Sequence, residues 1–501
     1  MDDDYDVLVI GAGLGGISTA ALLSAHGFRT LVLEQADTVG GCCSSFRHGG
    51  YLFDTGATMV MLTLPLEEIF RRMGKNMKDY IELIPCDPIY CVHAFDGRRF
   101  ALPRDIDEAA AVVASIAPED VEGWRKYVKV GMSMLELLGE MMLTPANTMS
   151  ETLRLYRRNP ALLRHLPYIL RTAQGVTLRW LHNPVLQSAV AFQAYCAGSP
   201  PDLGMGSLVF VALCEHLGIY YPRGGMIAIP EGIRRVGEEY GLEVRFNSKV
   251  EAILLEGRKA RGVVLEDGTV VTSRIVVSNV NAKLTYLKMV GPENLPAWAK
   301  RAIGSYEMAM PCPMVYVGLD TRPPLDAHHT ICTGHIDNFN KVWNEYYVRG
   351  IRPKGGGWLI SWPTESDPGL APEGCHTLNF VWGGPAPYAL LGDNWDRLKP
   401  SFIEEALGVL EKEVMRDISD HIKVVEVSTP LDFERRLLSP QGAIYGLFLD
   451  FLSSAMFRPH PRSRVIENLY LAGASTGLGG GVPTTLASGV IASDYVLRDH
   501  A

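Results

Sequence analysis

The sequence predicts an α/β fold made of two interleaved domains, and three observations support this. An apolar strand, a glycine-rich turn and a helix follow one another over residues 7–26. A similar strand, glycine turn and helix occupy 468–497, and the stretch from about 100 to 220 is mostly helical in pattern. Buried parallel strands read as continuous apolar runs, so both ends of the chain are expected to enter one parallel sheet. The middle of the chain then supplies a second, α+β domain.

The amino-acid composition argues against several classes of protein. The 501 residues are 47% hydrophobic, which is enough to bury a large core and excludes a disordered chain. The net charge is −9 with no basic tail, which argues against a nucleic-acid partner. Nine cysteines without a CxxC pair argue against a disulfide framework and a structural zinc site, so no metal is predicted.

The acidic start Met1–Asp6 differs from a basic secretory or transit signal and predicts a cytoplasmic location. Val7–Ala25 carries no charge, but its glycines divide it into a strand, a turn and a helix rather than a membrane span. The weakly charged stretch Asn183–Cys214 is interrupted by prolines. We expect that stretch to line an apolar cavity or to contact the inner face of a membrane.

The first unit consists of the strand Val7–Ile10, a helix to about His26 with Gly27 at its C-cap, and the strand Thr30–Leu33. Between the first strand and the helix stands Gly-x-Gly-x-x-Gly, formed by residues 11–16. Such glycines allow a tight turn, close approach of the backbone to a pyrophosphate, and close packing of helix on strand. Glu34 ends the second strand, close to the distance after the glycine motif at which an acidic residue binds the adenosine ribose. The unit therefore predicts dinucleotide binding.

The following segments favour FAD over NAD. Val39–Gly41 and Gly49–Gly56 form an extra glycine-rich strand and loop directly after the first unit. Asn468–Thr476 is expected to be a buried strand, followed by glycines at 479–481 and a small-residue helix from about Leu486 to Leu497. The N-terminus of that helix would point its dipole at the pyrimidine end of a reduced flavin.

The middle of the chain supplies a third piece. Gly241–Val250 is predicted as one strand, and 252–257, 263–267 and 270–275 as a meander with a turn at Asp267-Gly268. Val276–Val280 is predicted as a separate strand that returns to the sheet.

Together these motifs resemble those of the phytoene desaturase type of the flavin amine oxidase superfamily, which includes carotenoid desaturases, carotenoid isomerases and retinol saturases. The matching motifs are Phe53–Gly56, Tyr221–Met226, His328-His329, Thr429–Arg435, Gly442–Gly446 and Phe457–Gly481. The resemblance implies a Rossmann-like FAD-binding domain of the GR2 type with an interleaved α+β substrate-binding domain. According to this resemblance, the FAD-binding domain consists of residues 1–95, 221–290 and 420–501. The substrate-binding domain consists of residues 96–220 and 291–419.

The chain departs from the family pattern at four places. Cys42 stands where relatives usually have an arginine near the flavin phosphates, and Ala57 where desaturases often have proline. Thr476–Gly479 replaces Thr-His-Pro-Gly, and Ala474 stands where a related branch holds the ribityl chain with an acid. Cys42 and Cys43 are either redox active or, as we expect, small residues that pack under the cofactor.

The resemblance and the glycine pattern give a set of expected FAD contacts. These are Gly11, Gly13, Leu14, Gly15, Gly16, Glu34, Gln35, Gly41, Cys42, Asp54, Gly56, Ala57, Val250, Gly473, Ala474, Gly481, Val482 and Pro483. Tyr221, Glu434 and Tyr445 are candidate catalytic residues by motif position only. His328-His329 has no partner at ligand spacing and is expected to be structural or a substrate gate.

The predicted function is FAD-dependent desaturation of CH–CH bonds in a long apolar, carotenoid-like substrate. Alternatives left open are a redox-neutral isomerase or a saturase on reduced FAD, an oxidase of a small amine or alcohol, and a prenyl-binding chaperone without flavin. No second GxGxxG follows a strand, so oxygen or a quinone is the expected electron acceptor. A helix in 124–142 is expected to have an apolar face rich in Met and Leu, which suits an irregular apolar cavity. This face includes Met132, Met134, Leu135, Leu138, Met141 and Met142. The oligomeric state is left open.

Overall fold

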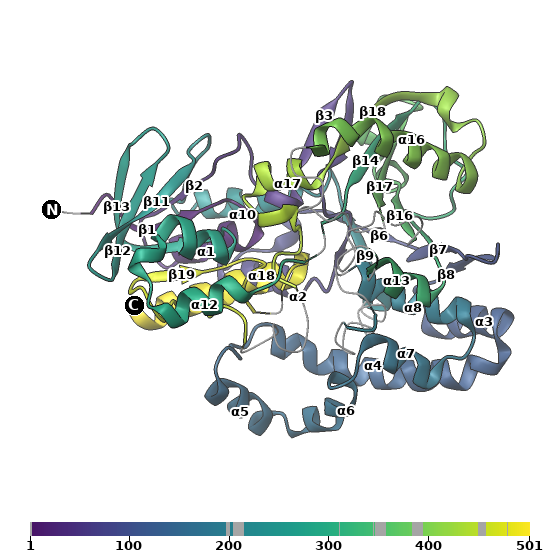
Figure 1. The fold of residues 1–501 in the computed structure, drawn as a ribbon, viewed down its shortest axis with the longest axis horizontal. Helices are drawn as coiled ribbons and strands as arrows, with labels where there is room; N and C mark the ends of the chain where they lie inside the picture. Colours follow the sequence, from purple (N-terminus) through teal and green to yellow (C-terminus); the bar gives the residue numbers. More distant parts are fainter. Residues whose placement is uncertain are drawn as a thin grey trace.

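A computed structural model describes residues 3–196, 201–203, 215–309, 311–343, 345, 357–382, 394–448, 457–477 and 479–500. Its strands form two seven-stranded sheets, one three-stranded sheet and one hairpin among these described residues. In the view of Figure 1 the first large sheet lies on the left with both chain termini, and the second lies on the right. Helices from the middle of the chain lie along the lower edge.

The first sheet joins the two ends of the chain to its middle. Four of its strands run parallel beside one another in the order β10-β2-β1-β13, and β19 pairs in parallel with β13. The antiparallel strands β12 and β11 extend it. The bounds are β1 Tyr5–Ile10, β2 Thr30–Leu33, β10 Glu243–Arg245, β11 Val250–Glu256, β12 Lys259–Leu265, β13 Val270–Ser278 and β19 Leu469–Leu471.

Strand β13 belongs to both halves of this sheet. Its first residues pair antiparallel with β12, and from Ser273 onwards it pairs in parallel with β1. The predicted break between a meander strand and a returning strand near residue 276 is therefore wrong. Buried and more exposed residues alternate along 270–274, and 275–278 are all buried without an interruption between them.

The predicted single strand over 241–250 is also wrong, because it is interrupted at Asn247. Asn247 has a φ of 51°, in the left-handed region that asparagine tolerates better than most residues. The amide of Asn247 donates to the Ala36 carbonyl at 3.0 Å, and that of Ser248 donates to the Glu34 carbonyl at 2.8 Å. The turn thus attaches the start of β11 to the end of β2.

Three helices cover one face of the first sheet: α1 Leu14–Ala25, α10 Ala228–Glu238 and α18 Val482–His500. Helix α1 ends at a His26 C-cap and is followed by Gly27 with a φ of 87°, as the sequence predicts. Helix α18 begins at Val482, earlier than the predicted Leu486. A Cβ on Gly489 would lie 2.7 Å from the Gly15 carbonyl oxygen, so α1 and α18 touch through their backbones.

The second sheet has the order β18-β14-β17-β16-β15-β7-β8. Its strands are β7 Tyr90–His93, β8 Arg99–Leu102, β14 Met314–Leu319, β15 His329–Cys332, β16 Trp358–Ser361, β17 His376–Trp382 and β18 Ile422–Ser428. Helix α16 Trp395–Glu413 packs on it through an apolar cluster that includes Trp395 and Phe402. Its strands come from both predicted segments of the substrate domain and also from residues 90–93 and 422–428, which the prediction assigned to the FAD-binding domain.

Smaller elements connect the sheets. The strands are β3 Ser45–His48, β4 Tyr51–Asp54, β5 Val60–Met61, β6 Leu83–Cys86 and β9 Ile219–Pro222. The helices are α2 Leu64–Arg72, α11 Ala282–Leu284, α12 Ala297–Ser305, α13 Ile336–Trp343, α14 Pro363–Ser366 and α17 Pro430–Leu437.

The described part of residues 100–220 is mostly helical, as the sequence predicts. Its helices are α3 Ile106–Ile116, α4 Val121–Met142, α5 Met149–Arg158, α6 Leu166–Ile169, α7 Ala173–Trp180 and α8 Pro184–Cys196. On α4, Met134 and Leu135 are buried in the main apolar cluster. The side chains of Leu138 and Met141, which the sequence placed on the same face, lie outside the described residues. No helix within the described ranges has both the length and the apolar run needed to cross a bilayer.

Candidate flavin site and its surroundings

Four strand ends meet at one edge of the first sheet. The amide of Gly11, after β1, donates to the Leu33 carbonyl at 2.8 Å, and that of Asn279, after β13, donates to the Ile10 carbonyl at 2.9 Å. After β19, the Ala472 amide donates to the Ser278 carbonyl at 3.0 Å. The carboxyl ends of parallel strands are where open α/β sheets bind ligands. Segments from both ends of the chain therefore converge on one site.

The first turn leaves no room for side chains. A Cβ on Gly16 would lie 2.1 Å from the Gly11 carbonyl oxygen, and one on Gly15 would lie 2.6 Å from the Gly473 amide nitrogen. Helix α1 starts behind Gly13 with no side-chain cap and no acidic residue in its first turn. Its free N–H groups and positive dipole end are thus available to an anion such as a pyrophosphate.

Glu34 is buried at the end of β2. Its carboxylate accepts hydrogen bonds from the Ala12 amide at 2.7 Å and the Ala36 amide at 2.9 Å. Burial raises the pKa of Glu34 although these hydrogen bonds oppose the shift. In this structure the carboxylate holds the turn in place, and its contact with a ribose stays a prediction. Val250 begins β11, next to the turn that is attached to Glu34.

Asn279 is a site residue that the sequence reasoning missed. A Cβ on Gly13 would lie 2.6 Å from the Asn279 Nδ2 atom, and one on Gly473 would lie 2.5 Å from its Oδ1 atom. The side chain therefore fills the space between the N-terminal and C-terminal glycine turns. Its position directly after the buried strand that ends at Ser278 was the available signal.

The C-terminal contacts gather at the start of α18. The Gly473 amide donates to the Ser488 hydroxyl at 2.7 Å, and the Ala474 carbonyl accepts from the Arg458 guanidinium at 2.7 Å. A Cβ on Gly480 would lie 2.6 Å from the Tyr445 Cα atom. Gly481 precedes α18, whose first residues are Val482 and Pro483. These predicted contacts therefore lie beside the segment that carries Tyr445.

The loop after β2 lies against the N-terminal turn. Residues 41–43 form a short 3-10 helix, and Gly40 pairs with Gly13 as an isolated bridge. The Cys42 thiol donates to the Ile444 carbonyl at 3.6 Å. Burial raises the pKa of Cys42 to about 11 and that of Cys43 well above its usual value. Neither thiol is ionised at neutral pH, which favours packing over redox chemistry.

Arg436 brings a positive charge to the same loop from α17, and the sequence reasoning did not include it. Burial is the main influence on the pKa of Cys42, and the nearby Arg436 guanidinium opposes it. The Arg436 Nε atom is buried without a hydrogen-bond partner, and the guanidinium carbon lies 5.1 Å from the Phe433 ring centroid. Gln35, a predicted contact, donates to the Arg436 carbonyl at 2.6 Å.

The Arg436 side chain is half-buried, and its Nη2 atom donates to the Thr55 carbonyl at 3.4 Å. A half-buried guanidinium without an acidic partner fits a bound phosphate. The described residues place no carboxylate in ion-pair distance of Arg436. The glycine turn and the uncapped start of α1 lie against the loop of Cys42, because Gly13 pairs with Gly40 of that loop. These observations fit FAD, whose pyrophosphate would lie against the amides after Gly13 and whose charge Arg436 would balance. The missing arginine at position 42 was the signal that another cation was needed.

Asp54 is the last residue of β4, is fully buried, and accepts three hydrogen bonds. The donors are the Tyr221 hydroxyl at 2.6 Å, the Ser45 hydroxyl at 2.8 Å and the Met226 amide at 2.8 Å. Burial raises the pKa of Asp54 to about 6 against these hydrogen bonds. Gly56 and Ala57 then lie against Cys42, whose carbonyl accepts from the Ala57 amide at 3.0 Å.

The three candidate catalytic residues come from different elements. Tyr221 is fully buried, donates to Asp54, and has its ring 4.7 Å from that of His328. Glu434 lies on α17, with one buried carboxylate oxygen that has no hydrogen-bond partner. Tyr445 lies with its backbone against Gly480 at the C-terminal glycine turn. A catalytic role for each stays a prediction.

His328 and His329 are both buried at β15. Burial lowers the pKa of His328 well below its usual value and that of His329 to about 4. His328 forms a hydrogen bond with the Ser366 hydroxyl at 2.7 Å, and His329 Nε2 lies 3.2 Å from the Thr58 carbonyl oxygen. Two neutral, buried imidazoles held by neighbouring groups fit the expected structural role.

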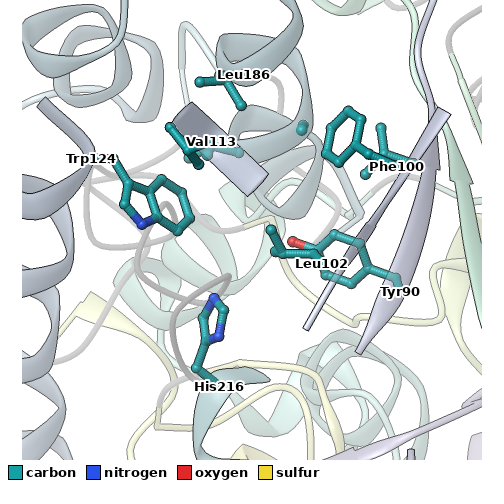
Figure 2. Close-up of a pocket in the computed structure, with 10 residues that line it drawn as sticks. Tyr90, Phe100, Leu102, Val113, Trp124, Leu186 and His216 are labelled. Atoms are coloured by element: carbon teal, nitrogen blue, oxygen red, sulfur yellow. The ribbon is translucent and has the colours of Figure 1, made fainter. Parts of the chain in front are cut away.

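An apolar cavity of about 20 Å³ lies between the second sheet and the helices α3, α4 and α8 (Figure 2). It is lined by Tyr90, Val92, Phe100, Leu102, Val113, Trp124, Leu186, Ala189, Val190 and His216. Helix α8 lines this small cavity, but a substrate cavity along Asn183–Cys214 stays a prediction. Residues 197–200 and 204–214 of that stretch lie outside the described residues. The space suits about one water molecule, so it is no channel for a long substrate.

His93, Cys332 and Glu413 place one nitrogen, one sulfur and one oxygen within 4.8 Å of one another. Glu413 forms an ion pair with Lys412 at 2.7 Å, and burial raises the pKa of Cys332 to about 12. Glu413 already has Lys412 as its partner, and the Cys332 thiol stays protonated. We therefore interpret these three residues as a polar contact between the ends of β7, β15 and α16.

The buried Asp54 predicts a pH dependence of stability. Its pKa rises from 3.8 to about 6 on folding, so the folded state holds the proton more tightly than the unfolded chain. Asp54 therefore stabilises the fold below about pH 4, and this contribution, about 3 kcal/mol, is lost as the pH rises through 6. In the variant Asp54→Asn this pH-dependent contribution to stability should vanish. The check is the unfolding free energy of both proteins from pH 4 to 7; equal slopes would contradict the assignment.

Comparison with known proteins places this chain in a family. The family model for flavin containing amine oxidoreductases matches residues 14–497. A phytoene desaturase (neurosporene-forming) from Cereibacter sphaeroides is 30% identical over 499 residues, covering 96% of this chain and 92% of the relative. A phytoene desaturase (lycopene-forming) from Pseudescherichia vulneris is 29% identical, covering 98% and 99%.

Solved structures agree in fold. An oxidoreductase from Methanosarcina mazei has a TM-score of 0.64 at 16% identity, covering 98% of this chain and all of that one. A putrescine oxidase bound to putrescine has a TM-score of 0.62 at 12% identity, covering 99% and 98%. With the glycine turns, the uncapped helix and the family match in agreement, the cofactor is FAD. The chain therefore belongs to the flavin containing amine oxidoreductase family and is a phytoene desaturase-type FAD-dependent oxidoreductase.

Proposed function

We propose that the enzyme desaturates a carotenoid precursor, removing two hydrogens from a CH–CH bond of a long polyisoprenoid. The observation that carries this proposal is the similarity to phytoene desaturases along nearly the whole chain rather than in the cofactor segments alone. FAD, when bound, supplies the hydride acceptor. Electrons would then pass to oxygen or a quinone, the acceptors expected from the sequence.

The chain's own residues would bind and orient the reactants. The glycine turns, Asn279 and Arg436 hold the cofactor at the strand ends. We assign the proton from the substrate to Glu434, because one of its carboxylate oxygens is buried without a hydrogen-bond partner. Tyr221 would act indirectly, by fixing Asp54 and hence the loop at Gly56.

The other functions considered have less support. The relatives' names do not favour an isomerase or a saturase. The likeness to putrescine oxidase and to a Rab GDI from Plasmodium falciparum, with a TM-score of 0.55 at 12% identity, concerns the fold alone. An uncapped helix and an arginine without an acidic partner at the cofactor edge speak for a bound dinucleotide and against a chaperone without flavin.

The test is anaerobic mixing of the flavin-loaded enzyme with phytoene in vesicles. We expect the flavin absorbance to bleach and the product to weigh two hydrogens less per turnover. Bleaching followed by recovery on admission of oxygen or a quinone would identify the acceptor. An unchanged substrate mass with a rearranged double bond would instead support the isomerase, and bleaching only by a soluble amine would refute carotenoid desaturation.

We propose further that the helices at the lower edge of Figure 1 contact a membrane, from which a water-insoluble substrate would be collected. In the segment 149–170 four apolar side chains are exposed by more than half: Met149, Leu153, Leu163 and Leu170. Arginines at 154, 157, 158, 164 and 171 lie in and beside the same segment. Exposed apolar groups beside basic ones are typical of interfacial segments.

Membrane contact predicts a loss of vesicle binding when the apolar surface is removed. The double variant Leu153→Gln/Leu170→Gln should float less with anionic vesicles than the wild type, at least about tenfold less by partition constant. Leu64→Gln, an exposed leucine on α2, is the matched control and should float like the wild type. Equal flotation of all three proteins would contradict the proposal.

A further inference from the structure

A second cavity lies at the surface between α5 and the C-terminal turn of α18, with a volume of about 130 Å³. The Tyr495 hydroxyl on α18 donates to the Glu151 carboxylate on α5 at 2.5 Å and so joins the two helices at this point. The cavity is lined by Thr144, Pro145, Glu151, Arg154, Leu155, Arg158 and Arg498. We infer that it binds a phosphate group.

The three guanidinium groups of the cavity lack acidic partners. Among the described residues, neither Arg154, Arg158 nor Arg498 lies within ion-pair distance of a carboxylate. The two acids nearest to Arg498 on α18 have other partners, since Asp494 pairs with Arg72 at 2.5 Å and Asp499 pairs with Arg462 at 3.1 Å. All three arginines are exposed, so water and salt screen their mutual repulsion. Three cations around one space still create a positive potential there that attracts an anion.

Glu151 is the one acid in the lining, and its oxygens are already used. It accepts from the Tyr495 hydroxyl and, at 3.0 Å, from the Asn147 amide. Burial opposes ionisation of Glu151, but the hydrogen bonds from Tyr495 and Thr148 prevail and its pKa lies below the usual value. The carboxylate thus remains ionised and holds α5 and α18 together. With three arginines and one ionised glutamate, the lining of the cavity carries a net charge of +2.

The donors suit a tetrahedral oxyanion better than a carboxylate. Guanidinium groups present planar forks of N–H donors, and several of them around one centre match the oxygens of a phosphate. The Arg498 guanidinium lies 5.1 Å from the Tyr495 ring centroid, which orients it before binding. A volume of this size exceeds that of a few water molecules and accommodates one phosphate group.

The phosphate has two chemical sources, a lipid headgroup or a soluble phosphate compound. The exposed Met149 and Leu153 on α5 stand beside the cavity's Arg154 and would face the acyl region if the source is a lipid. The cavity is formed by helices and by the end of the chain, whereas the predicted pyrophosphate contacts lie at the strand ends near Gly13. The inference therefore does not depend on the reaction that the enzyme catalyses.

Titration calorimetry of the flavin-loaded, full-length protein with inorganic phosphate at constant ionic strength tests the site. We expect saturable binding that weakens about tenfold in each of Arg154→Gln, Arg158→Gln and Arg498→Gln. Arg157→Gln changes a neighbouring exposed arginine of α5 outside the lining and should bind like the wild type. An unchanged flavin spectrum in every variant shows that the fold and the cofactor site are intact.

Vesicles separate the two sources. Phosphatidylcholine vesicles with and without phosphatidic acid are compared with sn-glycerol 3-phosphate as competitor. A lipid headgroup is identified by binding only to the vesicles that contain phosphatidic acid and by its loss in Arg498→Gln, which changes a lining arginine outside the segment 149–171. The control is Arg397→Gln, which changes an exposed arginine of α16 and should leave vesicle binding unchanged. Competition by glycerol phosphate without any vesicle preference identifies a soluble ligand. No phosphate binding by the wild type, or equal losses in Arg157→Gln and the lining variants, would overturn the site.

Discussion

Replacing Gly16 by alanine is expected to abolish flavin loading. The new Cβ would lie 2.1 Å from the Gly11 carbonyl oxygen, which is backbone and cannot rotate away. The turn must then open, and the amides after Gly13 lose their common direction. We expect FAD affinity to fall by more than about a hundredfold and stability by about 3 kcal/mol. The measurements are the flavin-to-protein ratio after purification and the thermal midpoint with and without added FAD.

The matched control is Gly408→Ala in α16. A Cβ at this helical glycine meets no atom within 4 Å, so the substitution should leave flavin loading unchanged and stabilise the fold by up to about 1 kcal/mol. A Gly16→Ala protein that carries as much flavin as Gly408→Ala would show that the turn does not bind the cofactor.

Replacing Arg436 by glutamine is expected to weaken FAD binding between about tenfold and a hundredfold. The reason is the loss of a partly buried cation that has no protein anion and that lies at the loop of Cys42. Glutamine keeps much of the length and polarity, so folding should persist. The measurement is the dissociation constant of FAD for the apoprotein, followed by flavin fluorescence at low and high salt.

Arg435→Gln is the control for this second prediction. Arg435 is the adjacent residue of α17, is exposed, and pairs with Asp396 at 3.1 Å. An exposed pair of this kind contributes about 1 kcal/mol or less, so its loss should leave FAD affinity unchanged. Equal weakening in both variants would indicate a general disturbance of α17, and no weakening in Arg436→Gln would refute a contact with the phosphates.

Local sequence patterns were sufficient for the elements around the first turn. The strands at 7–10 and 30–33 and the helix to His26 were predicted because periodicity, glycine spacing and caps act over a few residues. The same reasoning failed at Asn247 and within β13. Whether a strand breaks at these places depends on the partner of its backbone amides. The partners of Asn247 and Ser248 lie at the end of β2, and the partner of the second half of β13 is β1.

The glycine and strand pattern by itself predicted a dinucleotide, because the turn needs residues without a Cβ at fixed spacing, and the family match confirms FAD. It also predicted the sheet edge at which FAD would bind, and that position stays a prediction. Only the tertiary structure decided which side chains complete that edge. Asn279 and Arg436 are distant in sequence from Gly13, and their roles follow from the space between two glycine turns and from a charge left without a partner. Packing and electrostatic interactions depend on the distance between side chains in space. The order of residues along the chain says little about that distance when the residues are far apart in sequence.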